Sequence, residues 1–299
     1  MDLTEALNKV PALAGASEIE ELSGGLTNRN IKVTSANGEF VVRLSSNDTG
    51  LLAVDREVEF VNSQRAAQAG VGAEVVDYLP GQGVLVIRFI EGRTFTDADV
   101  AQEANWPRIA GACRRLHEGP RFVNTFDMFD IQHRYLDVVQ ERGFRLPEGY
   151  LEFLPAVARL RSAMTATADR TVPCNNDLLA GNFIDTGDAL MLIDYEYSGN
   201  NDPCFELGNI WSEAALPLEA LEHLVASYYG SHRPEKVARS RLMGLMSKYG
   251  WTLWASIQDA ISPIDFDFWS WGMEKYERAE SEFAPSTLNP LMEALVPRQ

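Results

Sequence analysis

The sequence predicts an α+β protein of two lobes. The small N-terminal lobe is expected to hold a five-stranded antiparallel sheet and one helix, and the larger C-terminal lobe to be mainly helical. Up to about residue 90, short apolar runs typical of strands alternate with turn residues. One helical run interrupts them after the third strand, and helical periodicity dominates from about residue 98 onward. We therefore expect lobes at 1–90 and 98–299, joined by a hinge at 91–97.

The order of turns and breaks defines the N-terminal lobe. A glycine-containing loop separates the first two strands, and Asn37-Gly38, a strong two-residue hairpin signal, joins the second strand to the third. A helix expected at 52–69 ends before Gly70, because glycine commonly follows the last helical residue. The strands are expected at 18–22, 31–34, 39–44, 73–78 and 84–89.

The C-terminal lobe is expected to be helical except for hairpins near its middle. Apolar residues recur there at intervals of three and four, the spacing of one helix face. The helical stretches are expected at roughly 98–118, 127–142, 148–168, 206–229 and 235–260.

Composition and charge narrow the classes of function. The formal net charge of −17 over 299 residues argues against nucleic-acid binding, which needs a basic face, but it attracts a cationic substrate. No apolar run approaches the roughly 20 residues of a membrane span, and the acidic start does not resemble a signal peptide. The three cysteines form no CxxC pair and are expected to be reduced thiols in a cytoplasmic protein.

The stretch 172–197 carries the strongest chemical signal. A short apolar run is followed by the polar residues Asn175-Asn176-Asp177. A hairpin of two short strands then begins near Asn182 and ends in Asp194. Such a hairpin can bring Asp177, Asn182 and Asp194 together around one point. A carboxylate that orients a hydroxyl, with an amide and a second carboxylate that hold magnesium, is the arrangement that phosphoryl transfer from ATP requires. The alternative is that each of these residues belongs only to a turn.

This stretch resembles the catalytic and metal-binding segments of the choline/ethanolamine kinases, which belong to the aminoglycoside-phosphotransferase-like and protein-kinase-like fold group. That family has His-Asn-Asp, four residues, Asn, and then Ile-Asp-Phe-Glu-Tyr-Ser. This chain has Asn175-Asn176-Asp177, four residues, Asn182, and then the run 193–198, Ile-Asp-Tyr-Glu-Tyr-Ser. The resemblance implies a two-lobed kinase-like fold, ATP as phosphoryl donor and Mg²⁺ as cofactor. It also implies that Asn175 replaces a histidine that ties the two segments together.

The nucleotide is expected to bind in the N-terminal lobe. Backbone N–H groups of a glycine loop can cover phosphates, although a Gly-Gly pair taken alone is more often a simple turn. The resemblance implies that Arg43, on the third strand, holds phosphate oxygens with its planar fork, with Glu57 as its carboxylate partner. The alternative is a surface arginine and a solvated helix acid. The loop residues expected to contact the nucleotide are Gly24, Gly25, Leu26, Thr27 and Asn28.

The substrate cation is expected to meet carboxylates and aromatic rings. Glu196 points to the same side as Asp194 on an extended segment, so it either assists the metal or faces the substrate. Four of the six tryptophans fall between residues 251 and 271, where the alternative is ordinary core packing. Ring faces attract quaternary ammonium groups. The resemblance places the choline pocket at Trp251, Trp254, Phe266 and Trp271.

The sequence thus predicts a cytoplasmic, magnesium-dependent kinase for choline, ethanolamine or a related alcohol, with Asp177 as the catalytic residue. Two alternatives remain at this point: a kinase of the same fold for an aminoglycoside, and a silent binding protein, which Asn175 would suggest. His117 is expected to be a packing or helix-capping residue. The expected partners are ATP and a small cationic alcohol, without nucleic acid or membrane, and a homodimer is left open.

Overall fold

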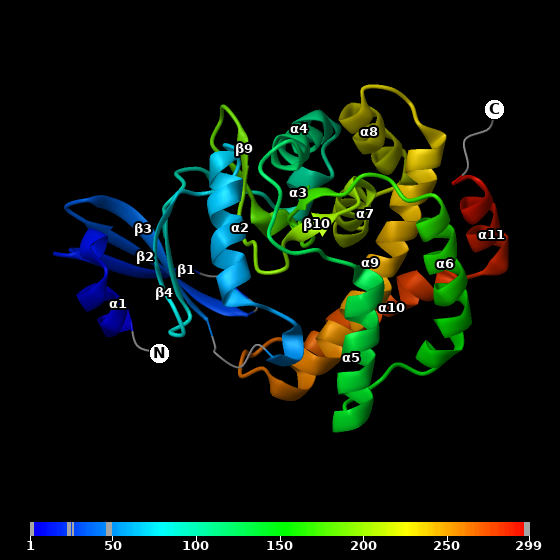
Figure 1. The fold of residues 1–299 in the computed structure, drawn as a ribbon, viewed down its shortest axis with the longest axis horizontal. Coiled ribbons are helices and arrows are strands. Elements are labelled where there is room, and N and C mark those ends of the chain that lie inside the picture. Colours follow the sequence, from blue (N-terminus) through cyan, green and yellow to red (C-terminus); the bar gives the residue numbers. More distant parts are fainter. Residues whose placement is uncertain (1–2, 23–24, 26, 46–49, 296–299) are drawn as a thin grey trace.

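The computed structural model describes residues 3–22, 25, 27–45 and 50–295. Its N-terminal part is an antiparallel sheet in the order β1-β2-β3-β5-β4 (Figure 1). The five-stranded antiparallel sheet predicted from the sequence is therefore confirmed. The strands are β1 (Glu18–Leu22), β2 (Asn28–Ser35), β3 (Gly38–Ser45), β4 (Val75–Leu79) and β5 (Val84–Arg88).

Alternating side chains decide which face of this sheet is buried. Along β2 and β3, Ile31, Val33, Phe40 and Val42 point into one apolar cluster, which the short helix α1 (Leu3–Lys9) covers. The turn between the two strands needs a left-handed residue, and Gly38 supplies it with φ of 121°. The cluster therefore fixes the register of β3, the strand that carries Arg43.

The helix α2 (Arg56–Gln68) stands between the sheet and the helical part of the molecule (Figure 1). Asp55 caps its start by accepting the backbone N–H groups of Glu57 and Val58. The side chains that α2 buries are largely polar, and Asn62 among them donates to Asn124 Oδ1 at 2.9 Å and to the Ser198 carbonyl at 3.3 Å. Hydrogen bonds rather than apolar packing thus fix α2 against the helical part.

The remaining chain forms the helical part and two small sheets. The strand β6 (Arg93–Thr94) lies within the expected hinge but pairs with β8 (Phe183–Asp185), which pairs with β9 (Leu190–Leu192). The strand β7 (Val172–Cys174) pairs with β10 (Gly199–Asn201). The helices are α3 (Asp97–Val100), α4 (Trp106–His117), α5 (Met128–Arg142), α6 (Leu154–Ala166), α7 (Pro203–Glu213), α8 (Leu218–Tyr229), α9 (Pro234–Ile261), α10 (Phe268–Glu282) and α11 (Pro285–Glu293).

The helix expected at 206–229 was wrong in one respect, because two helices, α7 and α8, occupy that stretch. Ala215 takes a left-handed φ of 48°, and Pro217 then lacks the N–H group that a continuing helix needs. The break lets α8 fold back beside α4, where it brings Tyr228 to His117.

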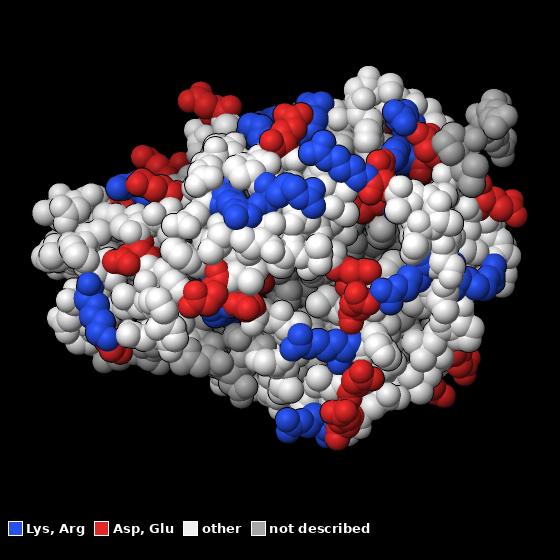
Figure 2. All heavy atoms as spheres, in the orientation of Figure 1, with Lys and Arg blue, Asp and Glu red and all other residues white. Residues whose placement is uncertain are grey.

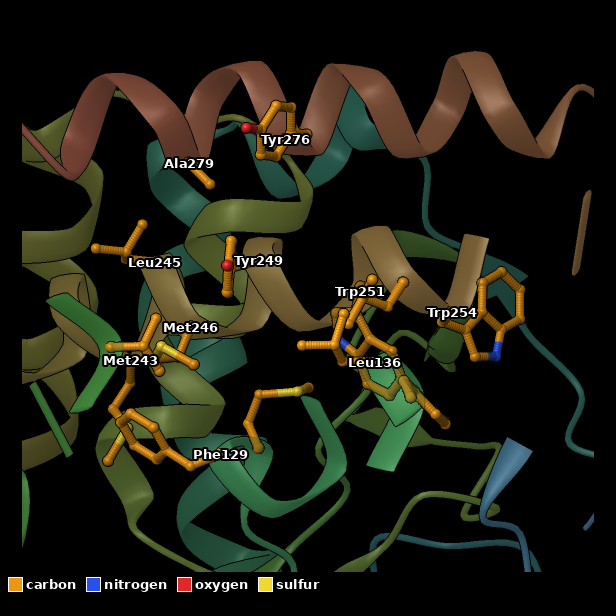
Figure 3. Close-up of a cluster of buried hydrophobic side chains, with 14 of the residues drawn as sticks. Phe129, Leu136, Met243, Leu245, Met246, Tyr249, Trp251, Trp254, Tyr276 and Ala279 are labelled. Carbon is orange, nitrogen blue, oxygen red and sulfur yellow. The ribbon is translucent and has the colours of Figure 1, made fainter. Parts of the chain in front are cut away.

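The 28-residue helix α9 is the centre of the helical part. It crosses α7 closely, since a Cβ atom added to Gly208 would lie 2.0 Å from the Ser240 carbonyl oxygen. Tyr249 of α9 stacks on Tyr150 with ring centres 4.0 Å apart, and each hydroxyl donates to the other residue's carbonyl. Figure 3 shows α9 side chains meeting Phe129 of α5 and Tyr276 of α10, with Trp251 and Trp254 farther along the same helix.

Charged side chains are spread rather than gathered on the face of the molecule that Figure 2 draws. On the face drawn in Figure 2, acidic and basic side chains are interspersed despite the formal net charge of −17. Among the described residues, no helix combines the length and the apolar character needed to cross a membrane.

Candidate active site

The segment 175–177, which we call the catalytic loop after the role expected for Asp177, follows directly after β7, and a buried carboxylate holds it. The two oxygens of Glu206, on α7, accept the backbone N–H groups of Asn175 and Asn176, each at 2.8 Å. Asn176 takes a left-handed φ of 70°, and its side chain donates to the Tyr197 carbonyl at 3.0 Å. A left-handed residue other than glycine persists only where its surroundings enforce it. These bonds therefore define where Asp177 lies.

Asn175 ties the catalytic loop to the segment that carries Asp194. Its Nδ2 donates to the carbonyl oxygens of Ile193 at 3.1 Å and Asp194 at 2.8 Å. Asp194 itself has a left-handed φ of 63°. The asparagine thus makes the tie expected at this position, using a hydrogen-bonding group where the family pattern has histidine.

Further hydrogen bonds connect Asp177, Asn182 and Asp194, the three residues that the sequence predicted to lie around one point. The side chain of Asn182 donates to the Asp177 carbonyl at 2.7 Å, and the backbone of Asn182 accepts the N–H of Ile193 at 3.1 Å. Asp177, Asn182 and Asp194 are therefore linked through hydrogen bonds of one small region.

Burial raises the pKa of the Asp177 carboxyl well above its usual range. The negative charges of Glu213, Asp194 and Glu196 raise it further, and Lys275 opposes them. A raised pKa gives the carboxylate a stronger tendency to accept a proton. The carboxyl is thus suited to act as a base.

Arg43 lies in a cluster of ionised side chains that we call the ion-pair cluster (Arg43, Arg56, Glu59, Asp194 and Glu196). Its Nη1 lies 2.7 Å from Glu59 Oε1, and its Nη2 lies 2.6 Å from Asp194 Oδ1 and 3.3 Å from Glu196 Oε2. The carboxylates outweigh the cost of burying the guanidinium and raise the pKa of Arg43, so it stays charged. Arg43 therefore connects β3 directly to Asp194.

The expected partner of Arg43, Glu57, was wrong, because Glu59 occupies that position. Glu57 is exposed, whereas Glu59 is buried and also pairs with Arg56 at 2.6 Å. The helical period carries the missed signal, since Glu59, Asn62, Ser63 and Ala66 share one buried stripe of α2. Glu57 lies off that stripe.

Glu196 connects the segment after β9 to the N-terminal part of the chain. Its carboxylate accepts hydrogen bonds from Thr27 at 2.8 Å, Asn28 at 3.1 Å and Arg56 at 2.9 Å. Burial acts to raise the pKa of Glu196, but Arg43 and Arg56 outweigh it and lower the pKa overall. Glu196 is therefore an ionised anchor for the glycine loop in this conformation. Arg56, which the sequence reasoning missed, supplies part of its counter-charge.

A cavity of about 440 Å³ opens beside this cluster, between the sheet and the small strands β8 and β9. Gly25 of the glycine loop lines it, while Thr27 and Asn28 turn to Glu196 instead. Gly24 and Leu26, also expected to contact the nucleotide, lie outside the described residues. The polar wall carries Arg43, Asn182 and Asp194, and the apolar wall carries Val41, Leu85, Ile87, Ile184 and Ile193.

The residues present fit a magnesium ion. Asn182 uses its amide nitrogen to bind the Asp177 carbonyl, which leaves Oδ1 as a ligand. Asp194 uses Oδ1 for Arg43, which leaves Oδ2. Magnesium is typically bound by one or two carboxylates together with substrate phosphates. Among the described residues, Asn182 and Asp194 are the two that could hold it at this cavity.

Of the four residues expected to line a choline pocket, Trp251, Trp254 and Trp271 lie in one aromatic cluster (Tyr197, Trp251, Trp254, Phe268 and Trp271). The exposed fraction is 3 % for Trp251 and 5 % for Trp254, whose Nε1 donates to the Tyr197 hydroxyl at 2.7 Å. Trp271 meets Trp254 edge-on at 5.6 Å between ring centres. Phe266 is 41 % exposed and reaches the cluster only through Phe268.

Two further charges lie against these rings. Lys275 pairs with Glu213, and its Nζ lies 3.9 Å from the centre of the Trp271 ring. The second oxygen of Glu213, Oε1, is buried and has no hydrogen-bond partner among the described residues. The negative charge of Glu213 raises the pKa of Asp177 and the positive charge of Lys275 lowers it, so both charges act on the catalytic loop.

The five-stranded sheet, the helical part and the carboxylates grouped at the cavity between them define an α+β protein of the kinase-like fold. A comparison with family models then specifies the class. The model described as choline/ethanolamine kinase matches residues 19–233. The chain belongs to the choline/ethanolamine kinase family.

Individual relatives agree with this assignment. Protein LicA of Haemophilus influenzae is 28 % identical over 246 residues, which cover 79 % of this chain and 72 % of LicA. A choline/ethanolamine kinase family protein of Mesorhizobium loti is 31 % identical, covers 99 % of both chains and superposes with a TM-score of 0.85. The choline kinase LicA of Streptococcus pneumoniae, at 22 % identity, shares the fold with a TM-score of 0.79 over 94 % of this chain and 98 % of its own.

Proposed function

We propose that this protein transfers the γ-phosphoryl group of ATP to the hydroxyl of choline or ethanolamine, with Mg²⁺ as cofactor. The observation that carries the proposal is that Asn182 and Asp194, with Arg43, line one cavity between the lobes, and that hydrogen bonds of Asn182 and Asn175 connect Asp177 to this group. These are the groups that phosphoryl transfer needs to orient a hydroxyl and to hold metal and phosphates.

The chain's own residues account for each part of the reaction. The hydroxyl oxygen attacks the γ-phosphorus, the bond to the leaving ADP oxygen breaks, and Asp177 accepts the hydroxyl proton. Arg43 and Gly25 position the phosphates, and Asn182 and Asp194 would hold the metal. Magnesium, when bound, neutralises negative charge that develops on the phosphate oxygens.

A cationic alcohol fits the surroundings of Asp177. The negative charge of Glu213 acts on the pKa of Asp177, and Glu213 Oε1 is a buried acceptor without a partner among the described residues. Lys275, which pairs with Glu213, lies against the ring of Trp271 in the aromatic cluster. A primary ammonium can donate to that oxygen, whereas a trimethylammonium group can gain only from charge and ring contacts. Both substrates are therefore retained in the proposal.

The two alternatives have less support. An aminoglycoside carries several ammonium groups and would be expected to need several free carboxylates, but Glu59, Asp194 and Glu196 are each paired with arginine. A silent binding protein was suggested by Asn175, yet Asn175 makes both bonds that tie the loop to the Asp194 segment.

ADP release by the purified protein tests the proposal. With MgATP, choline or ethanolamine should stimulate ADP release strongly, and kanamycin should not. Replacing Mg²⁺ by EDTA should abolish the stimulation. Stimulation by kanamycin alone would favour the aminoglycoside alternative, and no stimulation by any alcohol in a broad panel would favour the silent binding protein.

A further inference from the structure

Glu206 is a buried carboxylate whose charge needs compensation. Its exposed fraction is 0 %, and it holds the catalytic loop through the backbone N–H groups of Asn175 and Asn176. An ionised carboxylate is costly to bury unless hydrogen bonds and a positive group offset the lost hydration. Two amide N–H groups supply part of this compensation.

His117 is the group placed to supply the rest. Its Nε2 lies 3.6 Å from Glu206 Oε1, and no other basic side chain among the described residues is within 4 Å of that carboxylate. His117 is the last residue of α4 and is itself buried. The sequence predicted a packing or helix-capping role for His117. Such a role does not explain why His117 contacts Glu206.

A hydroxyl from a third helix orients the His117 ring. The Tyr228 oxygen, on α8, lies 2.7 Å from His117 Nδ1, and the two rings meet edge-on at 5.4 Å. Burial raises the pKa of Tyr228, so the phenol keeps its proton and can donate it to Nδ1. With Nδ1 accepting this hydrogen bond, the ring N–H lies on Nε2, which faces Glu206.

We propose that His117, oriented by Tyr228, is a positioning residue of the catalytic loop: it compensates Glu206 and thereby holds Asn175 and Asn176 in the conformation that places Asp177. The chain of contacts runs from α8 through α4 and α7 to the loop. It explains how a left-handed Asn176 is maintained immediately before the catalytic carboxylate. The effect of His117 on turnover rests on the proposed function, whereas its effect on the conformation of the catalytic loop does not.

A metal ion is the competing explanation for the same side chains. His117, Cys174 and Glu206 offer ligand atoms within 4.8 Å of one another. Against a metal, both oxygens of Glu206 already accept backbone N–H groups. The Cys174 sulfur also lies 3.8 Å from the Asn201 carbonyl oxygen, where it is placed to act as a thiol donor rather than a thiolate. Metal analysis of the purified protein should therefore find no stoichiometric zinc, and finding it would overturn the proposal.

Amide hydrogen exchange of the full-length protein tests the positioning role without requiring activity. In His117→Leu, exchange at Asn175 and Asn176 should accelerate about tenfold or more, while most other amides change little. His117→Gln retains a side-chain N–H and should recover part of the protection. The matched control is His223→Gln, a change at an exposed histidine of α8, which should leave the loop within twofold of wild type.

Tyr228→Phe keeps the ring and removes only the hydroxyl. It therefore tests the positioning role even if His117→Leu does not fold. It should accelerate loop exchange about threefold and lower kcat, with the KM for MgATP within twofold of wild type. Unchanged loop exchange in both variants, or equal acceleration throughout the chain, would overturn the positioning role. If the wild type phosphorylates no amino alcohol, the proposed function fails, and the exchange result still decides the role of His117.

Discussion

The ion-pair cluster and the aromatic cluster are both largely buried, but different forces hold them. In the ion-pair cluster, two arginines and three carboxylates from β3, α2 and the segment after β9 pair with one another, so each member depends on its partners. In the aromatic cluster, neighbouring rings meet edge-on with one hydrogen bond, from Trp254 to Tyr197. Removing one charge leaves another uncompensated, whereas a removed ring can be replaced in part by another apolar group.

The difference suggests a division of roles. The ion-pair cluster links the sheet to Asp194 and the glycine loop to Glu196, so it joins the two lobes across the cavity. The aromatic cluster lies wholly within the helical part. We expect the first to govern nucleotide and metal binding and the second to govern the choice of alcohol.

The largest expected effect is that of Asp194→Ala. The change removes the main protein charge that would oppose the metal and also leaves Arg43 without one partner, so magnesium-dependent nucleotide binding should be lost. Calorimetric titration with MgATP measures this. Asp188→Ala, in the exposed turn of the same hairpin, is the control and should bind normally. Unchanged MgATP affinity in Asp194→Ala would contradict the assignment.

Asp177→Asn should lower turnover by roughly 10²–10⁴, the usual contribution of a positioned general base. Because the Asp177 carboxylate belongs to neither cluster, MgATP affinity should stay nearly intact. Steady-state kcat and KM values separate the two effects. Turnover within a few-fold of wild type would show that another group accepts the proton.

Glu59→Gln should weaken MgATP binding about tenfold, since Arg43 and Arg56 each lose a carboxylate partner. Glu57→Gln is the matched control two residues away on the same helix, and it should change the affinity less than twofold. Equal effects of the two substitutions on MgATP affinity would mean that α2 acts as a whole and that the ion pairs are not specific.

Trp254→Ala should raise the KM for choline roughly tenfold or more, with a smaller effect on ethanolamine and little on ATP. A ring face against a desolvated trimethylammonium group contributes about 2 kcal/mol, and about 1.4 kcal/mol is a factor of ten. Trp254→Phe keeps a ring but loses the bond to Tyr197, so it should retain most of the choline affinity. If choline and ATP are weakened equally, or Trp254→Ala unfolds, Trp254 is a core residue.

The smallest expected effect is a gain in stability from Asp177→Asn. Burial raises the pKa of this carboxyl in the folded protein above its unfolded value, so the fold loses stability as the pH rises from the unfolded pKa through the folded one. The melting temperature of Asp177→Asn at pH 7 should therefore lie above that of the wild type. The gain should vanish below about pH 4, where aspartate is protonated even in the unfolded chain. A variant less stable than wild type at pH 7 would refute this.

The sequence by itself determined the strands of the N-terminal sheet, most of the helical stretches and the central motif. Alternating apolar residues and turn signals predicted all five strands of the sheet, because strand pairing through short hairpins is a local property of the chain. The sequence also predicted that Asp177, Asn182 and Asp194 lie close together, because one short hairpin connects them. The helical period of α2 could also have predicted that Glu59, rather than Glu57, contacts Arg43.

Only the tertiary structure decided which partners those residues meet. Arg56, Glu206 and the His117–Tyr228 contact come from segments far apart in sequence, and no spacing rule connects them. The same holds for the aromatic residues. Trp254 and Phe266 belong to one sequence pattern, yet one is buried and the other exposed. Burial and ion pairing depend on how α2, α4, α7 and α9 pack together, and the local sequence does not contain that packing.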